Sequence, residues 1–203
     1  IRTAAPDPSV GGPFVSPDWN GELPLDEVKD VRRIARVISI AEAGGNYSNE
    51  LKEIVRLSDT RKSPAGGKGA VPSVSAPPVL GITGTGGAGK STVTDEIVRR
   101  FLTNFTDKTI AVISVDPSKK KTGGALLGDR IRMNSINHPR AYMRSLATRD
   151  DNTALSGAVK DAINICKEAG FDFIILESAG VGQSDASILD YCDVSMYVMT
   201  PEY

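Results

Sequence analysis

One stretch of the sequence combines glycines with a lysine and a hydroxyl residue at a spacing that suits phosphate binding. Residues 84–91 read Gly-Thr-Gly-Gly-Ala-Gly-Lys-Ser and fit the pattern G-x-x-x-x-G-K-[ST]. Apolar residues predict a short strand over 79–83 before the motif and a helix after it. Glycines let backbone N–H groups face an anion, and the positive end of the helix adds to the attraction. The motif therefore predicts a nucleoside triphosphate site, in which Lys90 reaches the outer phosphates and Ser91 offers its hydroxyl to Mg²⁺.

Two carboxylates follow predicted strands further along the chain. Asp116 comes after the strand expected at 109–115, and Glu177 ends the strand expected at 171–177. In a parallel sheet both would emerge at the edge that holds the phosphate loop, where Mg²⁺ prefers oxygen ligands. We predict that each binds Mg²⁺ directly or through water. The alternative is that Asp116 caps a turn before Pro117 and that Glu177 caps the segment after it.

The segment between these carboxylates mixes glycines with charged residues. Residues 119–133 have the composition of a loop that nucleotide could order. Asp129 could reach the metal, and Arg130 or Arg132 could neutralise phosphate charge in the transition state. A surface position is the alternative for either arginine.

A second glycine loop follows Glu177 at residues 178–184. Gly180 can bring a backbone N–H close to a terminal phosphate, so that loss of this phosphate would release the loop. Gln183 could orient a water molecule or bond within its own loop. His138, the single histidine, precedes Pro139 and is predicted to be a surface or turn residue rather than a base.

The fold is predicted from the alternation of strands and helices after residue 78. Strands are expected at 79–83, 109–115, 140–144, 171–177 and 193–199, and helices at 90–104, 153–169 and 185–191. This order is typical of an α/β fold, here a P-loop NTPase with a mostly parallel sheet flanked by helices. The strand cores, including 194–199, are nearly continuous apolar runs, as in sheets that are covered on both faces.

The first 78 residues have a different organisation. Residues 1–24 are rich in proline and glycine and predict an extended segment, whereas 25–43 and 48–57 predict a helical hairpin that must dock on something larger. Ser48 or Asn49 is the expected cap of the second helix. The docking partner is either the neighbouring domain or another molecule. Residues 58–78 predict a flexible linker, so we divide the chain into a linker region, 1–78, and a P-loop domain, 79–203.

Composition narrows the function classes. The formal net charge is −1 and only 5% of residues are aromatic, which disfavours nucleic acid as a partner. No apolar run is long enough to predict a membrane span, and a cytoplasmic location is expected. Cys166 and Cys192 lie in apolar surroundings without metal-ligand spacing, which indicates buried thiols.

Four motifs in order resemble the metallochaperone-type GTPases that act with cobalamin-dependent acyl-CoA mutases. The motifs are residues 84–91, Val-Asp-Pro-Ser at 115–118, Thr-Gly-Gly at 122–124 with 127–133, and Glu-Ser-Ala-Gly-Val-Gly-Gln-Ser at 177–184. Within the family the closer likeness is to the fused isobutyryl-CoA mutases, in which a cobalamin-binding domain, a GTPase domain and a mutase domain share one chain. The helical segment before residue 78 looks like the linker between the first two of these domains.

The resemblance implies roles for individual residues. Phosphate binding falls to Gly84, Gly86, Gly87, Ala88, Gly89, Lys90, Ser91 and Thr92, with nucleotide contacts from Arg132 and Gly180. Mg²⁺ binding falls to Ser91, Asp116, Asp129 and Glu177, and the catalytic roles fall to Lys90, Arg132 and Glu177.

The resemblance also implies an activity and partners. GTP hydrolysis would gate the loading or protection of adenosylcobalamin in a mutase that interconverts isobutyryl-CoA and n-butyryl-CoA. The partners would be the cobalamin-binding and mutase domains of the same chain or a separate mutase, in a homodimeric protein, and adenosylcobalamin would not be bound by these residues.

Two departures from the family pattern leave alternatives open. The sequence has no Asn-Lys-x-Asp motif to read guanine and no Asp-x-His-x-x-Gly motif to bind cobalamin. We therefore expect the C-terminal part of the domain to be missing, which would leave apolar surface and a sheet edge uncovered. A P-loop kinase or ATPase and a regulatory module that binds nucleotide without hydrolysing it are the alternative functions.

Overall fold

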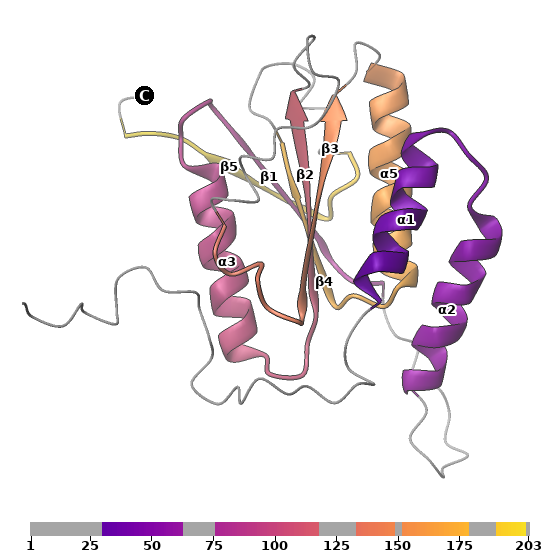
Figure 1. The fold of residues 1–203 in the computed structure, drawn as a ribbon. Coiled ribbons are helices and arrows are strands. Elements are labelled where there is room, and N and C mark those ends of the chain that lie inside the picture. The colour runs from indigo at the N-terminus through magenta and orange to yellow at the C-terminus, as the bar shows by residue number, and fades with distance from the viewer. Residues whose placement is uncertain (1–29, 63–75, 118–132, 149–151, 179–189, 202–203) are drawn as a thin grey trace, which may run out of the picture.

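The computed structural model describes residues 30–62, 76–117, 133–148, 152–178 and 190–201 (Figure 1). Five strands form one sheet in the order β3-β2-β4-β1-β5, and every strand pair is parallel. The strands are β1 (Val79–Gly84), β2 (Ile110–Pro117), β3 (Ala141–Thr148), β4 (Phe173–Glu177) and β5 (Val194–Val198). The α/β class predicted from the sequence is confirmed.

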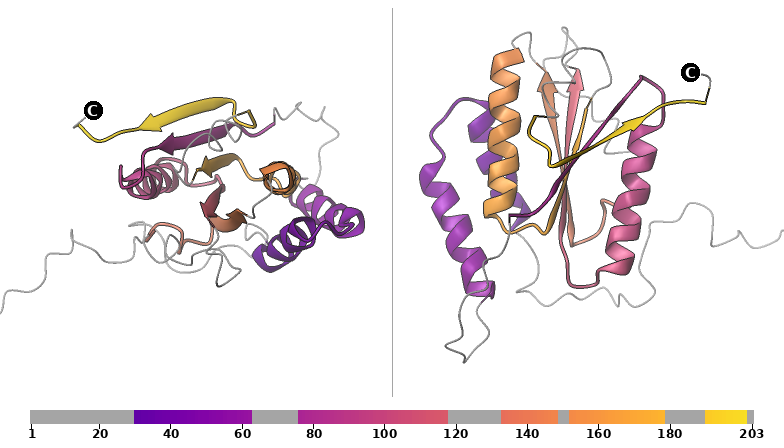
Figure 2. Two further views of the ribbon diagram at one scale, coloured as in Figure 1. Left: turned by 90° about the horizontal axis from the view of Figure 1, so that it is seen from above. Right: turned by 180° about the vertical axis from the view of Figure 1, so that it is seen from behind.

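Helices cover both faces of this sheet (Figure 2). The helix α3 (Lys90–Asn104) lies on one face, and α5 (Asn152–Glu168) lies on the other. The N-terminal helices α1 (Val31–Glu42) and α2 (Ser48–Lys62) pack on the same side as α5. The sheet therefore lies between helical layers, and its carboxyl edge stays available for ligands, as in other parallel α/β folds.

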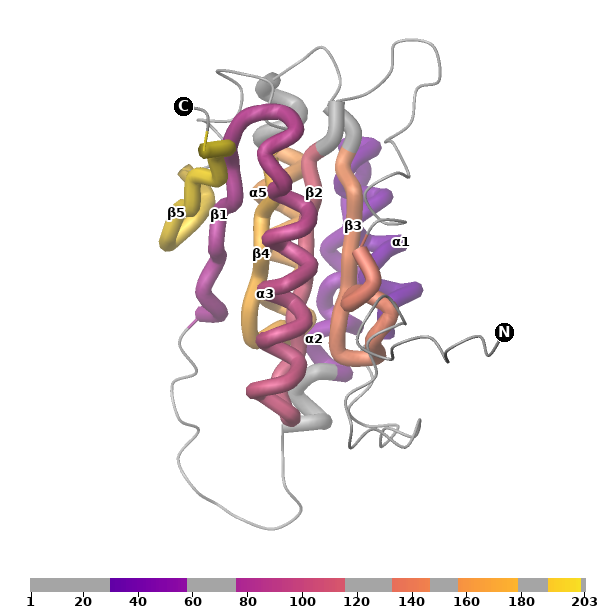
Figure 3. Tube along the Cα trace, turned by 90° about the vertical axis from the view of Figure 1, so that its left-hand side faces the viewer, coloured from indigo at the N-terminus to yellow at the C-terminus, as the bar shows by residue number. Residues whose placement is uncertain are grey.

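The helix α3 begins at the phosphate motif because of the residue before it. Gly89 is the N-cap and has a φ of 86°, which is a left-handed conformation that favours glycine. From there Thr94, Val98 and Leu102, spaced four residues apart, are buried on one side of the helix. Val98 and Leu102 pack into a cluster with residues of β1, β2 and β4, and Figure 3 shows α3 running along the face of the sheet. This packing holds the start of α3 beside the end of β1.

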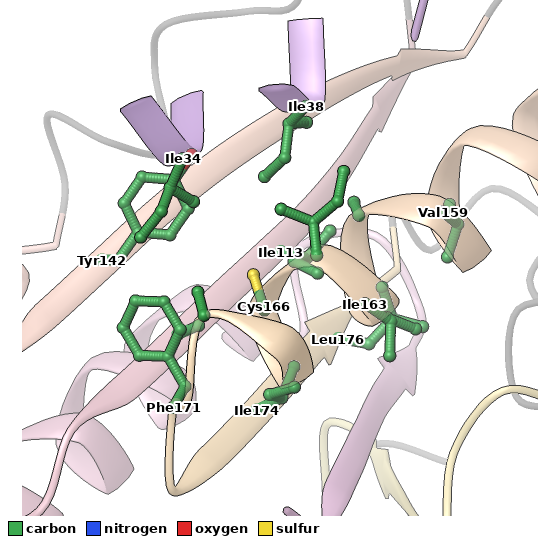
Figure 4. Close-up of a cluster of buried hydrophobic side chains, with 14 of the residues drawn as sticks. Ile34, Ile38, Ile113, Tyr142, Val159, Ile163, Cys166, Phe171, Ile174 and Leu176 are labelled. Carbon is green, nitrogen blue, oxygen red and sulfur yellow. The ribbon is translucent and has the colours of Figure 1, made fainter. Parts of the chain in front are cut away.

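The helical hairpin packs on the sheet side covered by α5. Ile34, Val37 and Ile38 of α1 are at most 2% exposed and belong to one apolar cluster with residues of β2, β3, β4 and α5 (Figure 4). Asp30 caps α1 by accepting a hydrogen bond from the Arg33 N–H, at 3.0 Å. Of the two docking partners that the sequence left open, the structure supports the neighbouring domain.

A polar contact also holds the hairpin in place. The Arg144 guanidinium on β3 pairs with the Glu42 carboxylate at the end of α1, and it donates to the Ser39 hydroxyl at 2.8 Å. Both ionised side chains are partly buried, so this pair is less screened by solvent than a surface ion pair. Residues 31–62 therefore join the fold of the P-loop domain through both apolar and charged contacts.

Several element boundaries differ from the sequence predictions. The helix α2 continues to Lys62, five residues beyond its predicted end at 57, and Asn46 rather than Ser48 or Asn49 supplies a side-chain acceptor at its start, to the Ser48 N–H. The strand β3 runs to Thr148 rather than ending at 144, because it pairs with β2 over eight residues. Residues 25–29, most of the helix expected at 185–191, and the extended segment 1–24 lie outside the described residues.

One packing prediction is wrong. The apolar run at 194–199 predicted a strand covered on both faces, but β5 is the edge strand of the sheet and is largely exposed. Val194, Tyr197 and Met199 are each more than half exposed. Among the described residues, nothing covers this apolar run on both faces.

Candidate functional site

The phosphate motif forms the turn between β1 and α3. Gly84 ends β1 so close to β5 that a Cβ on it would lie 1.9 Å from the Val198 carbonyl oxygen, which excludes any other residue there. Further along the turn, a Cβ on Gly86, Gly87 or Gly89 would meet no atom of the described residues within 4 Å, apart from the adjoining backbone. Within the described part of the chain, the backbone of the turn is therefore open to a bound anion.

Lys90, the first residue of α3, folds back over this turn. Its side chain is buried, and its ammonium group donates hydrogen bonds to the Gly84 carbonyl at 3.1 Å and the Thr85 carbonyl at 3.0 Å. These two acceptors hold the ammonium beside the backbone of the turn. A phosphate oxygen is a stronger acceptor for an ammonium than a neutral carbonyl. The structure thus places the lysine charge where a bound phosphate would need it.

Ser91 and Glu177 meet across the sheet edge, although they are far apart in the sequence. The Ser91 hydroxyl donates to Glu177 Oε1 at 2.7 Å. Glu177 is the last residue of β4, which lies next to β1 with Ile82 paired to Glu177, and only 2% of the glutamate is exposed. A hydroxyl and a carboxylate at this distance form a pair of hard oxygen donors. Their chemistry fits Mg²⁺ beside the phosphates of a nucleotide.

The remaining predicted site residues are placed only in part. Ala88 lies in the turn, where its N–H donates to the Thr85 carbonyl at 3.2 Å, and Thr92 is exposed in the first turn of α3. Asp116 belongs to β2, with its backbone paired to Ala147. In the register of β2 with β4, Ser114 lies opposite Glu177, which puts Asp116 two residues further along towards the same edge.

The residues expected on the two loops are not available for comparison. Asp129, Arg132, Gly180 and Gln183 lie outside the described residues, as does Arg130. Among the described residues, no three histidine, cysteine, aspartate or glutamate side chains gather as a metal site. The predicted ligand set of Ser91, Asp116, Asp129 and Glu177 is therefore observed only as the pair of Ser91 and Glu177.

Two further polar residues lie at this edge that sequence reasoning missed. The Ser178 hydroxyl donates to the Thr83 hydroxyl oxygen at 2.9 Å, and both residues are buried. Thr83 directly precedes the phosphate motif, and Ser178 directly follows Glu177. Thr83 ends one predicted strand and Ser178 follows another, and these positions were the only signal that could have revealed them, since small hydroxyl residues have no periodic pattern.

His138 lies away from this edge and differs from its prediction. It sits in a turn before β3, at the opposite end of the strands, but it is buried rather than on the surface. Its Nδ1 accepts a hydrogen bond from the Arg140 N–H at 3.1 Å. Burial, together with the nearby Arg140 charge, lowers the pKa of His138 to about 4. The histidine is thus neutral near pH 7 and structural, which agrees with the expectation that it is not a base at the nucleotide site.

Neither cysteine forms a disulfide, and of the two thiols predicted to be buried only Cys166 is fully buried. Cys166 is buried in the core between α5 and the sheet, and burial raises its pKa to about 12. Cys192 is half-buried, and burial together with the Asp193 charge raises its pKa to about 11. Neither thiol is activated as a nucleophile at neutral pH.

The parallel sheet, the glycine turn at the end of β1 and the Lys-Ser start of α3 define a P-loop nucleotide-binding protein. In the described part of the chain, no helix is long and apolar enough to cross a membrane. A sequence model of the family described as "Methylmalonyl Co-A mutase-associated GTPase MeaB" matches residues 35–203. The chain belongs to this family, and the resemblance drawn from its motifs is confirmed.

Individual relatives agree with this assignment. The chain is 56% identical over 178 residues to the fused isobutyryl-CoA mutase of Geobacillus kaustophilus, covering 86% of this chain and 15% of that protein. It is 47% identical over 177 residues to the fused isobutyryl-CoA mutase of Paraburkholderia xenovorans, covering 85% of this chain and 13% of that protein. It is also 36% identical to a putative GTPase of Pyrococcus horikoshii, covering 88% of this chain and 53% of the relative. The chain thus spans a small part of the fused mutases and about half of the putative GTPase.

Among solved structures, the comparison finds that of an LAO/AO transport system kinase. The TM-score is 0.45 and the identity 23%, covering 82% of this chain and 50% of that one.

Proposed function

We propose that this chain is a Mg²⁺-dependent module that binds and hydrolyses GTP and thereby gates the loading or protection of adenosylcobalamin in an acyl-CoA mutase. The observation that carries this proposal is the 2.7 Å contact between Ser91 and Glu177 at the end of the phosphate turn. It joins the hydroxyl of the P-loop to a carboxylate on a separate strand, which is the pairing that a Mg²⁺–nucleotide site needs. Family membership supplies the link to a mutase.

The mechanism divides the work among residues of the sheet edge. The glycine turn and the N-terminal N–H groups of α3 bind the phosphates, and the Lys90 ammonium exchanges its carbonyl acceptors for outer phosphate oxygens. Ser91 and Glu177, with Asp116 and Asp129, hold Mg²⁺, which when bound neutralises charge on the phosphate oxygens. Arg132 stabilises the charge that develops as water attacks the γ-phosphoryl group, and Gly180 senses that group through its backbone N–H.

The wider role rests on the relatives. Several are named fused isobutyryl-CoA mutases, so we propose that the cobalamin-binding and mutase domains of the same protein, or a separate mutase, are the partners. The mutase would interconvert isobutyryl-CoA and n-butyryl-CoA in a homodimeric protein. Adenosylcobalamin would bind to those domains, while the nucleotide state of this module would control access to it.

The test is nucleotide binding and turnover by the full-length protein that carries this chain. We expect Mg²⁺-dependent binding of GTP, weaker binding of ATP, and release of inorganic phosphate. Lys90→Ala should weaken GTP binding by about tenfold or more, because a charge-assisted contact to phosphate is lost. The control is Lys108→Ala, since the Lys108 ammonium pairs with Asp172 at 3.3 Å at the opposite end of the strands.

Other outcomes would contradict this proposal. A preference for ATP would favour an ATPase, and transfer of the phosphoryl group to an added acceptor would favour a kinase. Binding of GTP without any turnover would favour a regulatory module that only holds nucleotide. An equal loss of GTP affinity in the Lys90 and Lys108 variants would contradict the assignment of residues 84–91 as the phosphate-binding loop.

A further inference from the structure

Two buried hydroxyl groups link the ends of β1 and β4 beside the proposed nucleotide site. Ser178 Oγ donates to Thr83 Oγ1 at 2.9 Å, and the Ser178 N–H donates to the Ile82 carbonyl at 2.9 Å. Only 7% of Thr83 and 2% of Ser178 are exposed. The last paired residues of β1 and β4 are Ile82 and Glu177. The backbone bond from Ser178 continues the hydrogen bonding between these strands beyond that pair, and the hydroxyl bond adds a contact between the side chains of the next two residues.

The neighbours of this hydroxyl pair are residues of the proposed site. Thr83 directly precedes Gly84 in the sequence, and the Gly84 carbonyl accepts a hydrogen bond from the Lys90 ammonium. Ser178 is bonded to Glu177, whose carboxylate accepts the hydrogen bond from Ser91. A change in the separation of Thr83 and Ser178 would therefore shift the Glu177 carboxylate relative to the start of α3.

We propose that Thr83 and Ser178 are positioning residues that set the distance between Glu177 and Ser91 and so set the Mg²⁺ affinity of the site. This inference rests on the proposed GTPase function. Neither hydroxyl needs to touch Mg²⁺ or nucleotide to act in this way. Partners that orient a metal ligand commonly affect metal affinity nearly as strongly as the ligand itself, and a buried hydrogen bond is well suited to this role.

The alternative interpretation is that the Thr83–Ser178 hydrogen bond only stabilises the fold. A matched control variant distinguishes this from a positioning role. Thr109, the residue before strand β2, is also 7% exposed, and its hydroxyl donates to Asp172 Oδ2 at 2.9 Å. Thr83→Val and Thr109→Val remove the same group from equally buried sites. Both should reduce thermal stability, but only the Thr83 variant should change the response to Mg²⁺.

The experiment measures binding of a fluorescent GTP analogue to the full-length protein over a series of Mg²⁺ concentrations and in EDTA. For Thr83→Val and Ser178→Ala we expect the Mg²⁺ concentration at half-maximal binding to rise by about tenfold, with binding in EDTA unchanged. The double variant should show no larger shift than either single variant, because one interaction is lost in each case. Thr83→Ser keeps the hydroxyl and should restore a nearly wild-type Mg²⁺ response.

The opposite results would overturn the inference. An unchanged Mg²⁺ response in both Thr83→Val and Ser178→Ala, with a lower melting temperature, would show a structural clip. An equal shift in Thr109→Val would show a general effect of lost stability. GTP binding by the wild-type protein without any dependence on Mg²⁺ would contradict the proposed function. It would therefore also contradict the positioning role, whatever the variants showed.

Discussion

Individual hydrogen bonds at the carboxyl edge of the sheet hold the side chains of the proposed site in position. The Lys90 ammonium is held by two backbone carbonyls, and the Ser91 hydroxyl is held by the Glu177 carboxylate. Each of these contacts involves an ionised group and is at least partly buried, so it is stronger than the same contact in water. In the proposed function, nucleotide and Mg²⁺ would therefore replace these existing partners of Lys90 and Ser91. The existing contacts of Lys90 and Ser91 thus keep these side chains ordered before any ligand binds.

Some of these contacts could be predicted from the sequence and others could not. Glu177 was placed near the phosphate turn because carboxyl ends of parallel strands share one edge, and its contact with Ser91 follows from that rule. The bond between Thr83 and Ser178 depends on strand register, which no local pattern reveals. The burial of His138 was missed for a similar reason, since a histidine before a proline resembles a surface turn.

His138 leads to a prediction at the scale of one residue. Its pKa of about 4 lies below its ordinary value of 6.5, so the unfolded chain binds a proton at higher pH than the folded one. The free energy of unfolding should therefore fall as pH drops from about 6.5 towards about 4, and His138 should contribute no pH dependence above that range. Arg140, which reaches the carbonyls of Leu102, Phe105 and Lys108, is the charged group facing the ring and stays ionised throughout.

Urea unfolding at a series of pH values checks this prediction with His138→Asn. The asparagine oxygen can still accept from the Arg140 N–H but does not titrate. Over the acidic range, the unfolding free energy of the variant should fall less steeply than that of the wild type. Parallel curves for the two proteins would show that His138 does not carry this dependence.

At the scale of elements, the N-terminal hairpin is part of the domain rather than a separate arm. Its apolar stripe of Ile34, Val37 and Ile38 belongs to the same core cluster as Tyr142 and buried residues of α5, and Figure 4 shows Ile34 beside Tyr142. Glu42, at the end of α1, pairs with Arg144. The stripe was predictable from helical spacing, but its docking surface was not, because an amphipathic face does not specify what covers it. By contrast, the bounds of α3 agreed with the prediction, because the phosphate motif fixes its start.

Because the hairpin packs on the sheet, we expect a substitution in α1 to destabilise the strands of the sheet as well. Ile38→Ala should lower the unfolding free energy by about 2–5 kcal/mol, since it removes a side chain buried against the sheet. Urea unfolding gives the size of the loss, and amide hydrogen exchange should show faster opening of β2 and β3 as well as α1. Leu57→Ala is the control, because Leu57 on α2 is 38% exposed. Unchanged exchange in β2 and β3 would show that the hairpin opens independently of the sheet.

For the whole molecule, the architecture gathers the proposed chemistry at one edge of a sheet covered by helices. The phosphate turn, Glu177 and the end of β2 converge there. At one side of the sheet, the edge strand β5 exposes Val194 and Tyr197. The parallel topology followed from alternating strands and helices in the sequence. The exposure of β5 did not, because apolar residues alone do not distinguish a covered strand from an uncovered edge.

The most direct test of the proposed site is the Mg²⁺ dependence of GTP binding in Glu177→Gln. Calorimetric titration of the full-length protein should show that Mg²⁺ strengthens GTP binding in the wild type, and that this gain falls about tenfold or more in the variant. Glu53→Gln on α2, which removes only the exposed partner of Arg33, should behave as the wild type. Equal effects of Mg²⁺ on the wild type and Glu177→Gln would contradict the assignment of Glu177 and Ser91 to a metal–nucleotide site.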